Sequence, residues 1–175
     1  MTDPLFELKF PIGPFNFKSG SSDKQKAEWI RTIENFPSKL EAAIASMTKE
    51  ELEVPYRPQG WNSRQVVHHC ADSHMNSFIR LKLTLTEEKP AIRPYFEDRW
   101  AELPDSKIPV DVSLALLKAL HERWAILLRT LEEDDWAKTY YHPEHGTVFT
   151  LEEYLANYAW HCEHHLGHIG LVRGV

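Results

Sequence analysis

Near its C-terminus the chain reads His161-Cys162-Glu163-His164-His165-Leu166-Gly167-His168, which places four histidines in one predicted helix. Imidazole is the commonest metal ligand in proteins, and side chains four residues apart share one helical face. A second cluster, His68-His69 with His74 nearby, lies about ninety residues upstream on another predicted helix. Two helices that each offer imidazoles predict a three-histidine metal site inside a helical bundle.

Length and composition restrict the class of protein. A chain of 175 residues is typical of one domain, so we predict a single bundle domain over residues 1–175, with residues 1–22 as an extended leader. The formal net charge of −6 argues against a nucleic-acid or anionic-membrane partner. The two cysteines do not form a disulfide framework, and no apolar run is long enough to span a bilayer. We therefore predict a cytoplasmic protein.

Helical periodicity, capping residues and prolines indicate the order of the elements. Long helices are expected at about residues 22–47, 62–87, 111–131 and 150–172. Pro37 predicts a kink or an early break in the first helix. A proline-rich connection covers residues 89–109, and a turn at residues 143–146 predicts a small β-hairpin. The pattern predicts an all-α fold, a four-helix bundle with one long crossover connection.

A rotation of about 100° per residue sorts the histidines of the last helix by direction. His165 lies within the apolar stripe of this helix, and His161 lies at its edge. The pair His164 and His168 is rotated further toward the polar side. The inward-facing pair is therefore predicted to be His161 and His165.

The same rotation applied to the second helix places His68 near the middle of its apolar stripe. His69 and His74 fall on the two flanks. On the third helix His121 also points inward, and it is the main rival ligand. A buried histidine is often satisfied by hydrogen bonds alone, so a purely structural role is the alternative for each of them.

Other side chains are less suited to binding the metal. Cys70 is predicted to point outward and Cys162 to fill the core, so cysteine-based zinc binding is not expected. His142 and His145 are expected on a solvated turn.

Several motifs together resemble the YfiT branch of the DinB/YfiT-like metalloenzymes. They are the block Gly60-Trp61-Asn62-Ser63-Arg64-Gln65-Val66-Val67-His68-His69-Cys70-Ala71-Asp72-Ser73-His74 and the shorter stretches at residues 91–95, 141–143 and 160–165. The resemblance runs from about Lys24 to the C-terminus. It implies a four-helix bundle with one divalent metal per chain, held by residues that correspond to His68, His161 and His165.

Three imidazoles leave at least one coordination position open for water or substrate, as in catalytic zinc sites. The resemblance implies a metal-dependent hydrolase acting on a small-molecule substrate. Other members of the family use a low-molecular-weight thiol such as bacillithiol, so a thiol S-transferase is the alternative. A non-catalytic metal-binding stress protein is a second alternative. Zinc is the expected ion because of its availability, with nickel as the alternative.

The residues that would support such a site are less well defined. Asp72, one turn after His68, is the candidate for a carboxylate that orients an imidazole, and a helix ion pair is its alternative role. No general base is evident. The long connection is predicted to wall the substrate pocket through Arg93, Tyr95, Phe96 and Trp100. An outward-facing Trp160, together with the family resemblance, predicts a homodimer.

Overall fold

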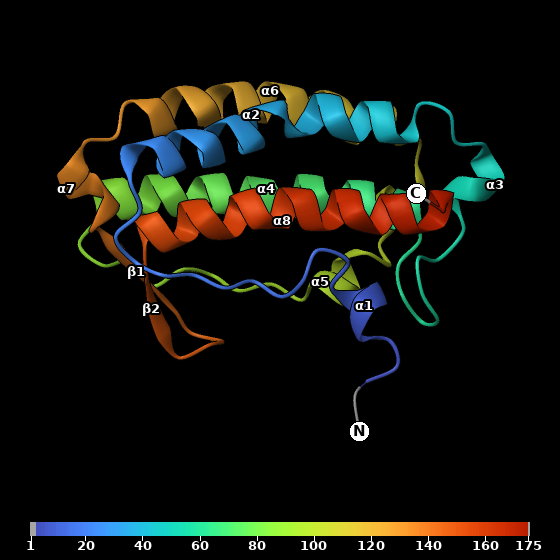
Figure 1. Ribbon diagram of the computed structural model, residues 1–175, viewed down its shortest axis with the longest axis horizontal. Coiled ribbons are helices and arrows are strands. Elements are labelled where there is room, and N and C mark those ends of the chain that lie inside the picture. The colour runs from blue at the N-terminus through green and yellow to red at the C-terminus, as the bar shows by residue number, and fades with distance from the viewer. Residues whose placement is uncertain (1–2, 175) are drawn as a thin grey trace.

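The computed structural model describes residues 3–174, in which four long helices form a bundle (Figure 1). These are α2 (Asp23–Ile44), α4 (Ser63–Thr86), α6 (Asp111–Arg129) and α8 (Leu151–Arg173). The shorter elements are α1 (Phe6–Lys9), α3 (Lys49–Leu52), α5 (Glu97–Trp100), the 3-10 helix η1 (Pro104–Lys107), α7 (Glu133–Trp136) and the hairpin strands β1 (Thr139–His142) and β2 (Thr147–Thr150). The predicted four-helix bundle and small hairpin are confirmed.

Side-chain caps define where three of the long helices begin. Ser22 and Thr150 each accept a hydrogen bond from the backbone N–H three residues later. Asn62 and Gln65 form a reciprocal capping box, in which each side chain accepts from the other residue's backbone N–H. These interactions satisfy amide groups that a helix N-terminus otherwise leaves unpaired.

The four long helices run in an order that requires the long crossover. Helix α2 packs on α6 and α8, and α4 packs on the same two helices. Contacts of His68 with Ser113 and of His74 with His121 show that α4 and α6 run parallel. The chain must therefore return along the bundle between them, and residues 87–110, which include α5 and η1, make this connection. Helices α4 and α8 run antiparallel and face the leader, α5 and the hairpin (Figure 1).

The core between the helices is apolar except for a polar stripe. Ile33, Leu117 and Trp124 are fully buried in it, and so are His74 and Ser77 of α4. Within residues 3–174, no helix has the length and apolar character needed to cross a bilayer.

Pro37 lies inside α2 and does not end it, since the helix continues to Ile44. A proline has no N–H to donate to the carbonyl four residues earlier, so the carbonyl of Ile33 has no partner from the helix backbone. Instead, the Nδ1 atom of His121 lies 2.6 Å from the Ile33 carbonyl oxygen. The predicted early break is absent. The proline instead leaves the carbonyl of Ile33 free to accept a hydrogen bond from His121.

The N-terminal segment runs alongside α8 (Figure 1), and two of its residues contact Trp160. The indole N–H of Trp160 donates to the carbonyl of Gly13 at 3.1 Å, and Phe15 packs against the same ring. This surface is therefore occupied by the chain itself, which removes the argument that Trp160 is exposed for a second copy. The homodimer stays a prediction.

Candidate metal centre

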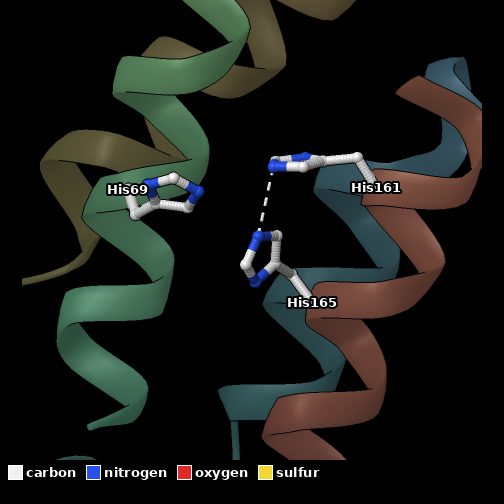
Figure 2. Close-up of side chains that lie close together, drawn as sticks. All are labelled: His69, His161 and His165. Atoms are coloured by element: carbon white, nitrogen blue, oxygen red, sulfur yellow. Dashed lines mark hydrogen bonds between the residues drawn. The ribbon is translucent and has the colours of Figure 1, made fainter. Parts of the chain in front are cut away.

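Two histidines of α8 face each other across one helical turn. His161 and His165 project toward α4, and their Nε2 atoms lie 3.1 Å apart (Figure 2). Their spacing of four residues places both side chains on one face of the helix. The structure thus brings together the two α8 residues that the sequence analysis selects.

The third imidazole beside this pair belongs to His69, and not to His68. One ring nitrogen from each of His69, His161 and His165 lies within 4.8 Å of the other two, the one such group of three potential ligands in residues 3–174. Figure 2 shows the His69 ring on α4 turned toward the α8 pair. The orientation predicted for α4 is therefore off by one residue.

His68 is engaged elsewhere. Its Nδ1 atom lies 2.7 Å from the Ser113 hydroxyl, and its Nε2 atom lies 3.1 Å from the carbonyl oxygen of Ile108. Both ring nitrogens are thus used to fasten α4 to the crossover and to the start of α6. Burial lowers the pKa of His68, which favours a neutral imidazole in this structural role.

The error in the orientation of α4 has a physical cause, because the side of α4 that faces the bundle is largely polar. Its buried residues include Cys70, Ser73, His74, Ser77 and Thr84. In contrast, Ile79 is 56% exposed, although a hydrophobic pattern assigns it to the core. The predicted outward direction of Cys70 is likewise wrong, since its side chain is completely buried.

Asp72 is not placed against the three imidazoles. Burial, and then the charge of Asp105, raises the pKa of the Asp72 carboxyl group to about 6. The charge of Asp105, a residue of η1, also raises the pKa of His68. Since Asp105 acts on both residues, Asp72 lies on the side of α4 near η1. Throughout residues 3–174 its carboxylate makes no hydrogen bond to a histidine, so the structure gives no support to its predicted role.

A line of hydrogen-bonded imidazoles, the histidine chain, passes through the site. It comprises His121, His74, His161, His165 and His168. From one end, the successive nitrogen contacts are Ile33 O to His121 Nδ1 at 2.6 Å, His121 Nε2 to His74 Nδ1 at 2.8 Å, and His74 Nε2 to His161 Nδ1 at 3.0 Å. The remainder are His161 Nε2 to His165 Nε2 at 3.1 Å, His165 Nδ1 to His168 Nδ1 at 3.3 Å, and His168 Nε2 to Lys9 O at 3.2 Å.

The histidine chain is one proton short. Both of its ends are backbone carbonyls, which can only accept a hydrogen bond. A neutral imidazole carries one N–H, so five imidazoles supply five protons to six contacts. One contact must therefore bring two lone pairs together.

An additional proton does not readily remove this shortage. Burial lowers the pKa values of His74, His161 and His165 well below the usual value for histidine, and the neighbouring histidines lower them further. The five imidazoles of the histidine chain are consequently uncharged at neutral pH. A metal cation binds to the lone pairs of neutral imidazoles, so it can occupy the contact at which two lone pairs meet.

The contact between His161 and His165 is where a cation fits. If the Nε2 atoms of His161 and His165 both bind a cation, every other contact in the histidine chain keeps one proton. Zinc–nitrogen bonds of about 2.0–2.1 Å in a tetrahedral site separate two ligand nitrogens by about 3.3 Å, close to the 3.1 Å found here. His69 supplies a third nitrogen within 4.8 Å of the other two. The residues present therefore fit a divalent cation.

Two cavities, with volumes of about 390 and 430 Å³, adjoin the site: the first borders all three imidazoles and the second borders His161. The first lies under the leader and is bordered by Tyr56, Trp61, His69, His164, His165 and His168. The second is bordered by Arg80, Tyr95, Phe96, His142 and Tyr158. His161, Glu97 and Asp98 border both cavities, which places His161 at their junction.

The long connection contributes to the second cavity only in part as predicted. Tyr95 and Phe96 border it, whereas Trp100 packs against the Tyr95 ring and Arg93 does not reach it. His142, expected on a solvated turn, is the last residue of β1 and is buried. The pair His164 and His168, expected toward the polar side, is buried as well.

A four-helix bundle with histidines from two antiparallel helices defines a class of protein. Residues 32–169 match the family model described as the DinB superfamily, and the chain belongs to this superfamily.

Individual relatives agree with the fold and with a metal site. Proteins of Bacillus cereus strain 03BB102 and Bacillus thuringiensis subsp. konkukian strain 97-27 are each 50% identical over 167 residues, which is 95% of this chain and 96% of theirs. Both carry the name "Putative metal-dependent hydrolase". The solved structure of YfiT from Bacillus subtilis, described as "a probable metal-dependent hydrolase with an unusual four-helix bundle topology", matches with a TM-score of 0.94 and 50% identity. This match covers 96% of the present chain and 97% of YfiT, which confirms the resemblance seen in the sequence.

Proposed function

We propose that this protein is a metal-dependent hydrolase of small molecules, with a divalent cation held by His69, His161 and His165. The observation that carries the proposal is the proton shortage of the histidine chain, which a cation relieves where three imidazoles converge. The names of the relatives support the same activity. Zinc is the preferred ion because of its availability, and nickel is the second choice for an all-imidazole site.

When bound, the cation supplies Lewis acidity and open coordination positions for water and substrate. The protein's own residues hold the ligands in the required form. With a cation on the Nε2 atoms, the Nδ1–H of His161 would donate to His74, and the Nδ1–H of His165 would donate to His168. Both ligands therefore direct an Nε2 lone pair at the cation. The two cavities have the size of small-molecule pockets, which supports a small substrate over a polymer.

Metal content tests the ligand assignment. Elemental analysis of wild-type protein loaded with zinc or nickel should find about one equivalent of metal per chain. His69→Phe should lose the metal on gel filtration, whereas His68→Phe should retain it because His68 is bonded to Ser113 and Ile108. The two substitutions are matched, since both remove a buried histidine from adjacent positions of α4. Retention in His69→Phe together with loss in His68→Phe would contradict the assignment.

Turnover tests the reaction type. The metal-loaded protein should hydrolyse members of a panel of small esters and amides without any added thiol, and chelation should abolish the rate. Rates strictly proportional to an added low-molecular-weight thiol, with no thiol-free background, would instead favour S-transfer at the same centre. Metal binding without turnover in either assay would favour the non-catalytic alternative.

A further inference from the structure

The second cavity is lined by a guanidinium group that makes no ion pair within residues 3–174. Arg80 of α4 is half-buried on its wall, and its Nε atom is fully buried with no hydrogen-bond partner. A guanidinium group offers five N–H donors, yet the one contact recorded for Arg80 within residues 3–174 is a long one of 3.4 Å to the Tyr158 hydroxyl. In the same part of the chain, no carboxylate oxygen lies within 4.0 Å of Arg80.

Another buried cation of this protein shows the usual arrangement. Lys26 is almost completely buried, and its ammonium group lies 2.7 Å from the carboxylate of Glu133. Removing a charged group from water without such a partner is unfavourable. The Nη2 group of Arg80 also makes no hydrogen bond within residues 3–174 and, unlike Nε, is not enclosed, so an anion in the cavity can accept from it.

A second side chain with an unpaired polar atom, that of His142, borders the same cavity. His142 is buried, and its Nδ1 atom has no hydrogen-bond partner. Burial, and then the nearby His145 and Arg80, lowers the pKa of His142 to about 4, so its imidazole is neutral near pH 7. The influence of Arg80 on this pKa shows that the two side chains are close to each other. A neutral imidazole can direct one N–H at an acceptor that the guanidinium also contacts.

The rim of the cavity restricts the kind of anion. Glu97, Asp98 and Glu144 are exposed at its border and carry negative charge. These carboxylates disfavour a dianion such as a phosphate monoester. A planar carboxylate has one negative charge and matches the two-pronged geometry of a guanidinium group.

The position of Arg80 relates this pocket to the histidine site. Arg80 lies six residues after His74 on α4, which is about 9 Å along the helix axis. His74 contacts His161, and His161 borders the cavity that Arg80 lines. A molecule held at Arg80 can thus extend toward the three imidazoles.

We propose that Arg80 and His142 form a carboxylate-binding subsite, and that the substrates are small molecules bearing a carboxylate group remote from the bond that reacts. The assignment to substrate rests on the proposed metal-dependent function. Binding of the carboxylate itself does not.

The test compares butyrate with butyramide, which have the same shape and differ in charge. The side-chain Nε–Hε NMR signal of Arg80, identified by its loss in Arg80→Gln, should shift on titration of metal-loaded protein with butyrate and stay in place with butyramide. Arg80→Gln should weaken butyrate binding, followed by calorimetry, about tenfold or more. Arg123→Gln is the matched control, because it removes the same charge from an exposed arginine that packs on Phe78 outside the cavity.

The metal site is tested separately in the same series. His69→Phe, which should lack metal, should still show the butyrate-dependent shift of the Arg80 signal. If it does while wild-type protein binds no metal, the proposed function fails and the carboxylate subsite stands. Equal responses to butyrate and butyramide, or equal butyrate affinity in Arg80→Gln and wild type, would overturn the subsite even if the metal is bound. Should Arg80→Gln fail to fold, calorimetry of butyrate against butyramide with wild-type protein and with His69→Phe gives this answer without any signal assignment.

Discussion

Replacing His121 tests whether the histidine chain supports metal binding from a distance. His121 is two hydrogen bonds away from the proposed cation and contacts none of its three ligands directly. Its ring is enclosed by Phe36, His74 and Trp124, so phenylalanine is a substitution of suitable shape. His121→Phe should weaken zinc binding while the three ligands remain in place.

The magnitude follows from counting protons. Without His121, four imidazoles supply four protons to the four remaining contacts, so the metal-free variant has no shortage. A cation then forces the Nδ1–H of His74 to point at the new phenyl ring with no acceptor. In the metal-free variant the lone pair of the same His74 Nδ1 atom faces the phenyl ring, so one unpaired atom is present with and without metal. The affinity that is lost is the relief of the shortage that wild-type protein gains on binding, about 1–3 kcal/mol for one unmade buried hydrogen bond, which corresponds to about 5- to 150-fold. The Ile33 carbonyl loses its partner with and without metal, so that loss cancels.

Competition against a chromophoric chelator measures the zinc affinity of each variant. His68→Phe is the control, because it also removes a buried histidine with two hydrogen bonds but lies outside the histidine chain. It should lower the free energy of unfolding and leave the zinc affinity within about twofold of wild type. Equal affinities for wild type and His121→Phe would refute the proton-counting argument.

Two further substitutions separate stability from metal binding. Pro37→Ala restores a backbone N–H that can donate to the Ile33 carbonyl in place of His121. The melting temperature should therefore rise. Chelator competition should show weaker zinc binding than in wild type, but stronger binding than in His121→Phe. Asp72→Asn should raise the melting temperature above about pH 6 and have no effect below about pH 4. Burial raises the Asp72 pKa from 3.8 to about 6, so the folded wild type binds the proton more tightly than the unfolded chain and loses stability as the pH rises through this window. A melting-temperature difference that is constant from pH 4 to pH 8 would show that another interaction is responsible.

The fold was predictable because its signals are local. Capping residues such as Asn62 and Thr150 fix the start of a helix through atoms only three residues away. The spacing of His161 and His165 likewise needs only the geometry of one helix. These features depend on short stretches of chain, which the sequence displays directly.

The identity of the third histidine depends on the partners of α4 in space. Ser77 and His74 are buried because they bond to Tyr154, His121 and His161 on other helices. A hydrophobic pattern contains no information on these hydrogen bonds. The orientation of α4 that it predicts is therefore off by one residue, with His68 facing the site in place of His69. Local rules commonly fail at functional sites, because the residues there serve a purpose other than burial of apolar surface. The recurrence of small or polar residues at Cys70, Ser73, Ser77 and Thr84 was the available signal.

Both ends of the histidine chain are backbone carbonyls that a regular helix would normally pair. At one end, Pro37 has no N–H to offer Ile33. At the other, Lys9 is the last residue of the one-turn helix α1, where carbonyls have no partner within the helix. Because neither acceptor can supply a proton, the shortage cannot be met from the ends. A cation on the Nε2 atoms of His161 and His165 then selects the one polarity in which every other contact keeps a proton and both terminal imidazoles donate outward. A proline inside α2 and a short helix in the leader thereby set the form of two imidazoles that neither of them touches.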